Sequence, residues 1–369
     1  MSKRATEQLR RCGQSIWLDF ISQGLIRSGE LKEMVEHGDL TGVTSNPTIF
    51  EKAIDGGHDY DQSLSRLIAT NPQLTAYELY ERMSIEDVRM TADVLRGVYD
   101  HTHGSDGFIS IEVSPRVAHD THASISEGMS LWEEVDRPNL MIKIPATVEG
   151  VPAIEQLLAQ GINVNVTMMF SLAHYNAVAA AFLRGIERAQ DPTHIASAAS
   201  IFVSRMDAAV DRALDEIGTP EALALRGKVA IANARVIYAR FRKLFYSARF
   251  AALRLRGVRV QRVLWGSTGT KNAAYSDVRY VEELIGPDTI NTIPPTTLQA
   301  FREHGQVRGL TLEEGLAEAT LILKQLSTLG IDLDAIAQQL QTDGVAAFSS
   351  SLNKLSRTIE TKQDSMVHA

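Results

Sequence analysis

Short apolar runs alternate with segments of helical spacing along most of the chain, and no other feature of the sequence limits the possible folds so strongly. Eight runs end in polar or turn residues and are typical of buried strands; they cover residues 15–20, 42–47, 108–115, 139–145, 162–170, 199–205, 261–267 and 288–294. A helical segment lies between most of them. In residues 149–161, for example, Ile154, Leu157 and Leu158 fall on one helical face before the stop signal of a glycine.

Strands that alternate with helices predict parallel β/α units, and eight such units close most economically into a (β/α)8 barrel. We therefore expect one α/β barrel domain over residues 1–369, with additional helices. A doubly wound open sheet is the alternative, but no glycine-rich dinucleotide fingerprint follows the first strand. Residues 206–257 predict a helical elaboration between the sixth and seventh strands, made of two helices broken near Gly218. The last residues, 356–369, are typical of a flexible tail.

Composition argues against several classes of partner. The chain has 369 residues, 44% of them hydrophobic, which is enough for a substantial core, and its net charge is -8. Such a chain has no broad attraction for nucleic acid or anionic membranes, and no apolar stretch reaches the roughly 18 residues of a membrane span. The single cysteine, Cys12, cannot form an internal disulfide, and no apolar signal region follows the charged N-terminus. We expect a cytoplasmic protein that binds small molecules, and homo-oligomer formation stays open.

One lysine interrupts the apolar run at residues 139–145, and its position needs a physical reason. Lys143 stands between Ile142 and Ile144, and a buried ammonium costs several kcal/mol unless it is paired, loses its proton or performs chemistry. In a β/α barrel the active site lies at the C-terminal ends of the strands, so polar residues there have a functional interpretation. The other predicted strands contribute Asp19, Thr44, Ser45, Asn46, Glu112, Ser114, Asn165, Thr167, Ser200, Ser204 and Arg205.

Each of these residues also has a purely structural interpretation. Lys143 could extend from the rim into water, Glu112 could pair with a helix lysine, and Asp19 could cap the following helix. Ser114 and Ser200 are more typical of packing and hydrogen bonding than of nucleophiles, because no serine occupies a G-x-S-x-G turn. One barrel explains all of these positions together, whereas the structural interpretation requires several unrelated accidents.

A lysine beside carboxylates, without a cofactor motif, indicates amine catalysis. A desolvated amine that has lost its proton attacks a ketone and forms a Schiff base, whose iminium accepts the electrons of a neighbouring carbon–carbon bond. Glu112 would shuttle protons directly or through a water held by Thr167. Asp19 would move the proton of the hydroxyl released in the cleavage.

A glycine-containing turn, G-S-T-G-T-K-N, follows the seventh predicted strand at residues 266–272. Barrels commonly bind a phosphate in this region through backbone N–H groups. The turn lacks the Walker A spacing, and a flexible loop without a ligand is the alternative. With Arg205 at the end of the sixth strand, the pattern favours a phosphate clamp made by Arg205, Ser267 and Lys271.

Two histidine pairs raise the question of a metal site. The first, His101 and His103, lies in a predicted loop, and the second, His119 and His122, lies at the start of a predicted helix. The first pair lies beside Gly104 and Asp106, and the helix of the second pair carries Ile125 and Leu131 on its other side, so we expect four solvated histidines and no metal.

The motifs around these residues resemble those of transaldolases, Schiff-base enzymes of the class I aldolase superfamily that act in the pentose phosphate pathway. The similarity extends over most of residues 10–345. It is carried by W-L-D, G-V-T-S-N-P-T-I-F, I-S-I-E-V-S-P, N-L-M-I-K-I-P-A-T, G-I-N-V-N-V-T-M-M-F-S and I-F-V-S-R.

The resemblance implies a (β/α)8 barrel, permuted so that the lysine lies on the fourth strand, and no cofactor. By this resemblance Lys143 is the Schiff-base residue, and Glu112 is the acid/base that works through a water held by Thr167. Asp19 is then the acid/base for carbon–carbon cleavage. The residues implied to bind substrate are Asn46, Asn165, Ser200 and Phe202, and those implied to bind its phosphate are Arg205 and the 267–271 loop. The implied reaction transfers a dihydroxyacetone unit from sedoheptulose 7-phosphate or fructose 6-phosphate to an aldose phosphate such as glyceraldehyde 3-phosphate.

The sequence departs from the family pattern in places. Lys271 stands where a second phosphate-binding arginine is common, and Ser204 replaces the glycine of F-V-G-R. The helical insertion and T-S-N in place of T-T-N resemble the larger bacterial transaldolases, which also occur fused to a sugar-phosphate isomerase. Three rival functions are an aldolase that releases free dihydroxyacetone, a silent barrel that binds a sugar phosphate, and a metal-dependent hydrolase.

Overall fold

The computed structural model describes residues 4–55 and 57–367, and within them eight parallel strands close into a barrel. Neighbours pair in chain order, and β1 closes the ring against β8 with Ile16 opposite Asn291. The strands are β1 (Gln14–Leu18), β2 (Gly42–Thr44), β3 (Ile109–Glu112), β4 (Leu140–Pro145), β5 (Val164–Met169), β6 (Ser197–Phe202), β7 (Gln261–Gly266) and β8 (Thr289–Ile293). The predicted (β/α)8 barrel is confirmed, and the open doubly wound sheet is wrong.

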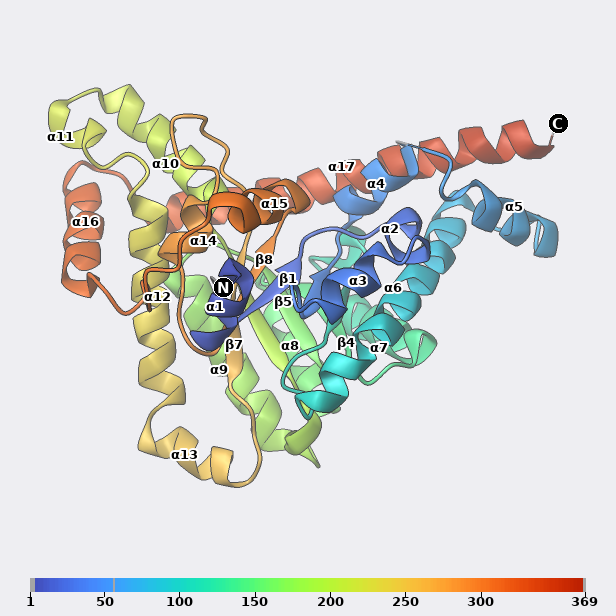
Figure 1. Ribbon diagram of the computed structural model, residues 1–369, viewed down its shortest axis with the longest axis horizontal. Coiled ribbons are helices and arrows are strands. Elements are labelled where there is room, and N and C mark those ends of the chain that lie inside the picture. The colour runs from blue at the N-terminus through green and yellow to red at the C-terminus, as the bar shows by residue number, and fades with distance from the viewer. Residues whose placement is uncertain (1–3, 56, 368–369) are drawn as a thin grey trace.

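Helices surround the barrel (Figure 1). Those up to β5 are α1 (Ala5–Arg11), α2 (Gln23–Arg27), α3 (Glu30–Glu36), α4 (Pro47–Asp55), α5 (Asp61–Thr70), α6 (Ala76–His101), α7 (Thr121–Val135) and α8 (Gly150–Ala159). Those after it are α9 (Leu172–Arg188), α10 (Ser204–Ile217), α11 (Pro220–Leu223), α12 (Val229–Phe245), α13 (Ala248–Leu255), α14 (Arg279–Glu283), α15 (Pro295–His304), α16 (Leu316–Thr328) and α17 (Leu333–Val367). Short 3-10 turns cover Pro115–Val117 and Pro192–His194.

Alternate residues of the strands form a hydrophobic cluster separate from the main core. Its members are Trp17, Phe108, Met141, Ala196, Ala198, Leu264 and Ile290. The residues between them, such as Ile16 and Ile142, belong to the main core that packs under the helices. Because successive strand side chains face opposite sides, Lys143 shares its face with Met141, and Ser200 shares its face with Ala198. The polar residues of the strand ends therefore continue the lining that this cluster begins.

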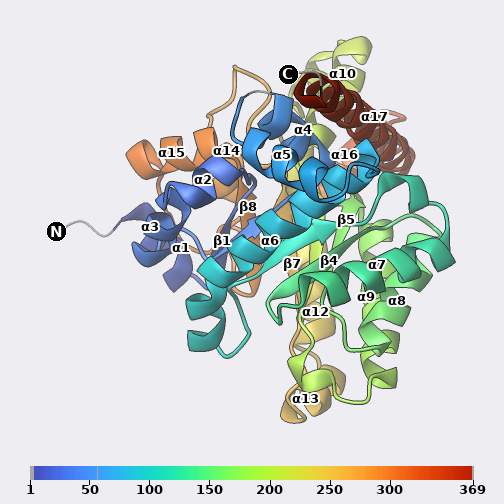
Figure 2. The ribbon, with the colours of Figure 1, turned by 90° about the vertical axis from the view of Figure 1, so that its right-hand side faces the viewer.

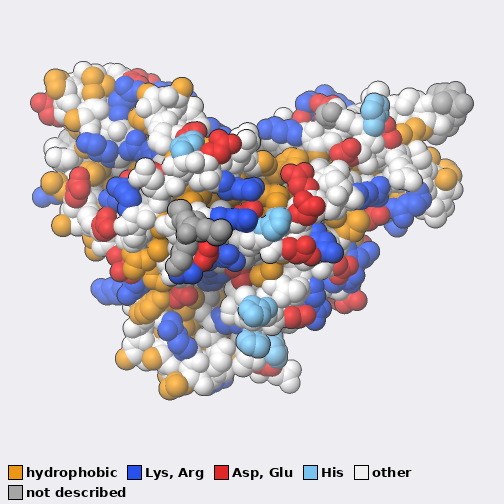
Figure 3. Space-filling model, in the orientation of Figure 1, with side chains coloured by type: hydrophobic (Ala, Val, Ile, Leu, Met, Phe, Trp, Pro, Cys, Tyr) orange, Lys and Arg blue, Asp and Glu red, His pale blue; other side chains and the backbone are white. Residues whose placement is uncertain are grey.

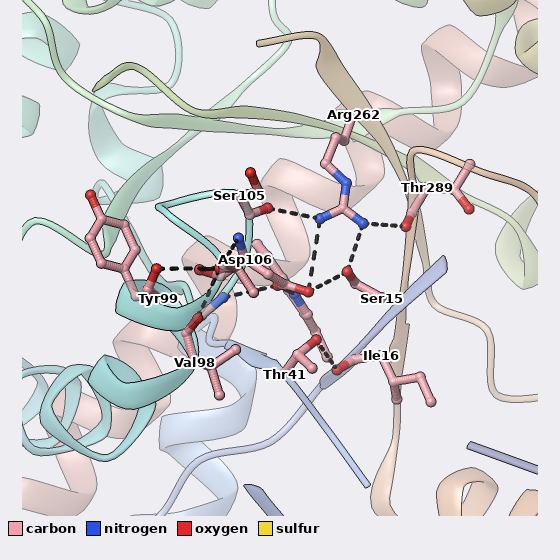
Figure 4. Close-up of polar contacts among 12 residues, drawn as sticks. Ser15, Ile16, Thr41, Val98, Tyr99, Ser105, Asp106, Arg262 and Thr289 are labelled. Atoms are coloured by element: carbon pink, nitrogen blue, oxygen red, sulfur yellow. Dashed lines mark hydrogen bonds and ion pairs between the residues drawn. The ribbon is translucent and has the colours of Figure 1, made fainter. Parts of the chain in front are cut away.

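A polar network joins the N-terminal ends of the strands (Figure 4). Asp106 accepts hydrogen bonds from the Ser15 hydroxyl and from Trp17 Nε1, the latter at 2.9 Å. Arg262 donates to Ser15 Oγ and to the carbonyl of Thr289, both at 2.6 Å. A cavity of about 1000 Å³ lies beside this network and includes Ser15, Asp106 and Arg262 in its lining. Lys143 does not line that cavity, which lies at the opposite end of the strands from the predicted catalytic residues.

The insertion between β6 and β7 is helical, as predicted, but it contains four helices, α10 to α13, where the sequence predicted two. The predicted break is present at Gly218, which ends α10 with a φ of 69°, a left-handed conformation that favours glycine. Thr219 then caps α11 by accepting a hydrogen bond from the Ala222 N–H at 3.3 Å. The extra division comes from Ser247, which caps α13 only two residues after α12 ends.

The C-terminal helix corrects another prediction. Residues 356–367, expected to be a flexible tail, continue α17, which runs past α4 toward α5 (Figures 1 and 2). Ile359 is fully buried. Lys362 Nζ donates to Asp61 Oδ1 at 2.6 Å and to the Gly57 carbonyl at 3.2 Å. Contacts with segments distant in sequence thus stabilise a stretch with little apolar content, and residues 368–369 lie outside the described residues.

The surface shows no single-sign region on the face in Figure 3, where Lys and Arg are interspersed with Asp and Glu. This distribution agrees with the modest net charge of -8. A membrane-crossing helix would need a long apolar stretch, and no helix within residues 4–55 and 57–367 has one.

Candidate active site

Lys143 and Glu112 form an ion pair in the interior of the barrel. The two residues stand directly opposite each other in β4 and β3. Lys143 Nζ lies 3.1 Å from Glu112 Oε2, and the side chains are only 6% and 5% exposed. Nζ also donates a hydrogen bond to the Ser45 carbonyl at 3.2 Å. The structural interpretations are therefore wrong for both residues, because the lysine does not extend into water and Glu112 does not pair with a helix lysine.

Asp19 lies just beyond the end of β1. Its Oδ1 accepts a hydrogen bond from Thr44 Oγ1 at 2.9 Å, and Thr44 also contacts Thr292 Oγ1 at 2.7 Å. Asp19 does not cap the following helix, because Ser22 is the N-cap of α2. The carboxylate is thus held by β2 at the same end of the barrel as Lys143.

Burial and charge oppose each other at the two carboxyl groups. Burial raises the pKa of Glu112, and the nearby Lys143 partly offsets that rise. Burial likewise raises the pKa of Asp19, while Lys143, the Thr44 hydrogen bond, Lys271 and Arg205 oppose the rise. Both carboxyl groups therefore accept a proton more readily than a solvated carboxylate does, which suits groups that must exchange protons during a reaction.

A polar layer lies between the apolar cluster and the strand ends. Asn165 Nδ2 donates to Ser110 Oγ at 2.9 Å, and Ser200 Oγ donates to Asn165 Oδ1 at 2.6 Å. Asn165 is also the direct neighbour of Lys143 in the β4–β5 pair. These bonds fix the Asn165 amide next to the amine, where it can contact a bound molecule.

Thr167 has an unusual hydroxyl. The side chain is fully buried, and within the described residues its Oγ1 has no hydrogen-bond partner. Leaving a buried hydroxyl unpaired costs about 1–3 kcal/mol. A water molecule or a substrate group is the natural partner, because an unsatisfied buried polar atom commonly binds one.

Phe202 is the last residue of β6, and Asn46 lies two residues after the end of β2. Phe202 stacks on Phe170 with 5.4 Å between ring centroids and is partly exposed. Asn46 Oδ1 accepts a hydrogen bond from the Ile49 N–H at 3.0 Å and so caps α4, which leaves its amide NH2 for other contacts.

The predicted phosphate-binding residues lie beyond β6 and β7. Arg205, in the first turn of α10, places its guanidinium 5.7 Å from the Phe202 ring centroid, and burial lowers its pKa. Ser267, which follows β7, has a φ of 55°, and its hydroxyl lies 3.0 Å from that of Ser204. Ser204 therefore joins the 267–271 loop to the start of α10. Lys271 is exposed, and its charge acts on Asp19 together with that of Arg205.

The candidate metal ligands are dispersed. His101, His103, His119 and His122 are exposed, as the sequence predicted. Across residues 4–55 and 57–367, no group of three or more His, Cys, Asp or Glu side chains is arranged to hold a metal ion.

Sequence reasoning missed the contribution of α17 to this end of the barrel. Gln341 is buried, and its Nε2 donates to the Ala146 and Met168 carbonyls, both at 2.9 Å. Ala146 follows the lysine strand and Met168 follows Thr167, so α17 contacts both strand ends. A glutamine in a helical pattern, almost 200 residues beyond the lysine, gives no local signal of such a contact.

A closed parallel barrel, with its lysine and carboxylates at the C-terminal strand ends, places the protein among the (β/α)8-barrel enzymes. The family model described as "Transaldolase/Fructose-6-phosphate aldolase" matches residues 16–359. A "Transaldolase" of Frankia alni is 47% identical over 356 residues, covering 95% of each chain. A "Transaldolase 1" of Streptomyces coelicolor is 46% identical and covers 98% of this chain and 95% of its own. A "Transaldolase" of Mycobacterium tuberculosis is 45% identical and covers 94% of each.

The chain therefore belongs to the transaldolase/fructose-6-phosphate aldolase family. The resemblance noted in the sequence is confirmed, and the protein is an enzyme of the transaldolase type.

Proposed function

We propose that the enzyme transfers a dihydroxyacetone unit between sugar phosphates through a Schiff base on Lys143. The donor would be sedoheptulose 7-phosphate or fructose 6-phosphate, and the acceptor an aldose phosphate such as glyceraldehyde 3-phosphate. One observation supports the proposal most directly: an enclosed primary amine lies 3.1 Å from a carboxylate whose pKa is raised by burial. That carboxylate can take the proton from the ammonium and leave a nucleophilic amine.

The first half of the reaction cleaves the donor. The Lys143 amine attacks the ketone carbon, and the carbonyl oxygen leaves as water after proton transfer through Glu112. Asp19 removes the proton from the hydroxyl on the carbon beyond the bond to be broken. That carbon–carbon bond then breaks, its electrons pass to the iminium nitrogen, and an aldose phosphate departs while a three-carbon enamine stays on Lys143.

The second half reverses these steps on another aldehyde. The enamine carbon attacks the acceptor carbonyl carbon, and Asp19 returns its proton to the new hydroxyl. A water molecule then adds to the iminium carbon, with Glu112 as the base and the Thr167 hydroxyl as the group that holds the water. The ketose product leaves, and the amine is restored. The unpaired Thr167 Oγ1 supports this role, because the water supplies the partner that it lacks.

The remaining residues would bind the substrate. Asn46 and Asn165 would bind its hydroxyls and the dihydroxyacetone unit, and Ser200 and Phe202 would line the pocket. Its phosphate would lie between Arg205, Ser267 and Lys271. Two cations at this position, both acting on Asp19, support binding of a dianion.

The proposed substrates suggest a pathway, and the single cysteine is consistent with a reducing compartment. Interconversion of these sugar phosphates belongs to the non-oxidative pentose phosphate pathway, and we place the enzyme in the cytoplasm. The proposed mechanism uses only side chains of this chain.

Trapping with borohydride tests the proposal. With the donor ketose phosphate present, borohydride should reduce the iminium and leave a three-carbon adduct on Lys143, detected by mass spectrometry of peptides. The Lys143→Ala variant should carry none. An unmodified wild-type protein would favour the silent sugar-phosphate-binding barrel. A protein that forms the adduct but turns over equally well without an acceptor aldose phosphate would be a simple aldolase.

A further inference from the structure

The side chain of Gln341 bridges the ends of two catalytic strands. It lies on α17 and is 3% exposed. Its NH2 group donates one hydrogen bond to the Ala146 carbonyl and one to the Met168 carbonyl. Both carbonyl oxygens lie 2.9 Å from Nε2. Its Oε1 in turn accepts a hydrogen bond from Gln338 Nε2 at 3.3 Å. Both N–H donors of the Gln341 amide therefore have acceptors, and the hydrogen bond from Gln338 to its oxygen fixes the orientation of the amide.

The two carbonyls flank the last bond of the β4–β5 pair. Ala146 lies three residues after Lys143, and its N–H donates to the Thr167 carbonyl at 2.8 Å. Met168 is the residue directly after Thr167. Gln341 thus ties the peptide group after Met168, one residue beyond Thr167, to the peptide group after Ala146, which follows the strand that carries the amine.

The backbone at Met168 needs such support. Its φ is 58°, in the left-handed region, although it is not a glycine, and the pairing register of β5 with β6 shifts between Val166 and Met169. A side chain in this conformation costs of order 1–3 kcal/mol and persists only where its surroundings hold it. The irregularity includes Thr167, whose buried hydroxyl has no hydrogen-bond partner within the described residues.

A glycine within α17 allows the helix to approach Met168 of β5 closely. A Cβ at Gly344 would lie 2.7 Å from Met168 Sδ and 3.8 Å from Arg205 Nη1. A larger residue at 344 would therefore displace the Met168 thioether, which packs against the helix at this glycine. Glycine costs helix stability at an interior position, and here it allows Gln341 to reach the two carbonyls.

We propose that Gln341 is a positioning residue, which holds the Thr167 hydroxyl in register with Lys143 so that the water used by Glu112 lies at the iminium carbon. The inference rests on the proposed Schiff-base function and deepens it. Lys143 itself is held by Glu112 and by the Ser45 carbonyl. Because dehydration to the iminium and its hydrolysis are one step in opposite directions, loss of the Gln341 bonds slows both, while donor binding changes little.

The test uses Gln341→Glu in the full-length enzyme. A carboxylate has nearly the same shape but presents oxygens to two carbonyl oxygens, so both hydrogen bonds are lost when it is ionised, and protonation restores one donor. At pH 8 we expect kcat to fall about 10- to 100-fold, the scale of a displacement of about 1 Å at a catalytic group, while KM changes less than about threefold. As the pH falls toward 6, kcat should recover relative to wild type, because burial favours the protonated acid.

Two further measurements separate positioning from a general loss of structure. The rate at which Lys143 becomes trappable by borohydride after mixing with the donor should fall in Gln341→Glu by about the same factor as kcat, because dehydration to the iminium uses the same water position and Glu112. Gln339→Glu is the matched control on the same helix; Gln339 is exposed, and its variant should match wild type in all three readouts. Should Gln341→Glu not fold at pH 8, Gln341→Met removes both donors at similar volume, and it should show the same loss of kcat and the same slowing of adduct formation.

The outcomes discriminate between the two proposals. If wild type forms no adduct, the Schiff-base function itself fails. If wild type forms the adduct and a folded Gln341 variant keeps wild-type kcat, or loses kcat equally at every pH while it forms the adduct at the wild-type rate, only the positioning role of Gln341 is overturned.

Discussion

Glu112 and Lys143 are direct partners in the pairing of β3 with β4, and their side chains meet at 3.1 Å within the barrel. A one-residue shift of either strand would turn one of the two side chains to the opposite face. The register of the barrel therefore sets the chemistry of the site. This relationship gives the first prediction.

Glu112→Gln keeps the shape of the side chain but removes its ability to carry protons. We expect kcat to fall about 10²- to 10⁴-fold, the usual contribution of a general acid–base group. Steady-state kinetics with donor and acceptor measure the effect, and near-ultraviolet circular dichroism checks that the fold is retained. A folded variant with kcat within about threefold of wild type would remove Glu112 from the mechanism.

Thr167→Val separates catalysis from stability. The Thr167 hydroxyl has no partner within the described residues, so its removal should leave the free energy of unfolding unchanged or slightly higher. If it holds the reacting water, kcat should nevertheless fall about 10- to 100-fold. Urea unfolding and steady-state kinetics on the same sample give both numbers. A stable variant with unchanged kcat would contradict the role of Thr167 in water binding. A strongly destabilised variant would show that the Thr167 hydroxyl has a hydrogen-bond partner in the folded protein.

Arg205→Met tests the phosphate clamp. A hydrogen bond to a charged group contributes about 1.5–3 kcal/mol, so KM for the phosphorylated donor should rise about 10- to 150-fold. Lys271→Met should raise KM less, because Lys271 is exposed. Fructose in place of fructose 6-phosphate is the control substrate, since a donor without a phosphate cannot lose that contact. An equal loss with both donors would assign Arg205 a structural role.

Asp87 predicts a pH dependence of stability. Its Oδ2 accepts a hydrogen bond from Tyr60 at 2.7 Å, and burial raises the pKa of Asp87 to about 7 from the model-peptide value of 3.8. Between these two values the folded state binds the proton more tightly than the unfolded state does. The free energy of unfolding should therefore decrease as pH rises from about 4 to about 7, by up to about 4 kcal/mol.

Urea unfolding across this pH range measures the Asp87 contribution. Asp87→Asn should remove it and give a more stable protein than wild type at pH 8. Asp100→Asn, at an exposed position of the same helix, should leave the wild-type pH dependence in place. A wild-type and an Asp87→Asn profile of the same shape would show that the buried carboxyl group does not titrate in this range.

Ile359→Ala tests whether the end of α17 is part of the folded protein. The side chain is fully buried, and truncation of a buried isoleucine costs about 2–5 kcal/mol. Glu360→Ala, at the next and exposed position, should change stability by less than about 0.5 kcal/mol. Equal unfolding midpoints for the two variants would restore the flexible tail that the sequence predicted.

The strands were predictable because their signal is local. A strand buried on both faces is a short apolar run, and all eight such runs contain the observed strands or overlap them. The signal of Lys143 is local too, because a charged residue within an apolar run must be paired, lose its proton or perform chemistry. The positions of Glu112 and Asp19 at the C-terminal ends of predicted strands then placed them at the same end of the barrel.

The missed features depend on contacts distant in sequence. Residues 356–367 contain few apolar side chains, and their helix is stabilised by partners such as Asp61 on α5. Gln341 acquires its partners only because α17 returns to the end of β5. The unusual φ of Met168 is likewise imposed by packing and not by its residue type. No window of the sequence contains this information.

The reach of α17 also bears on how the enzyme is made. The barrel closes only when β1 pairs with β8, and the last helix contributes to the site only after that. During synthesis the nascent chain thus contains Lys143 well before the later strands and α17, which complete this end of the barrel, have been made. A chain that stops before β8 therefore lacks the strand that closes the wall around Lys143 and Glu112.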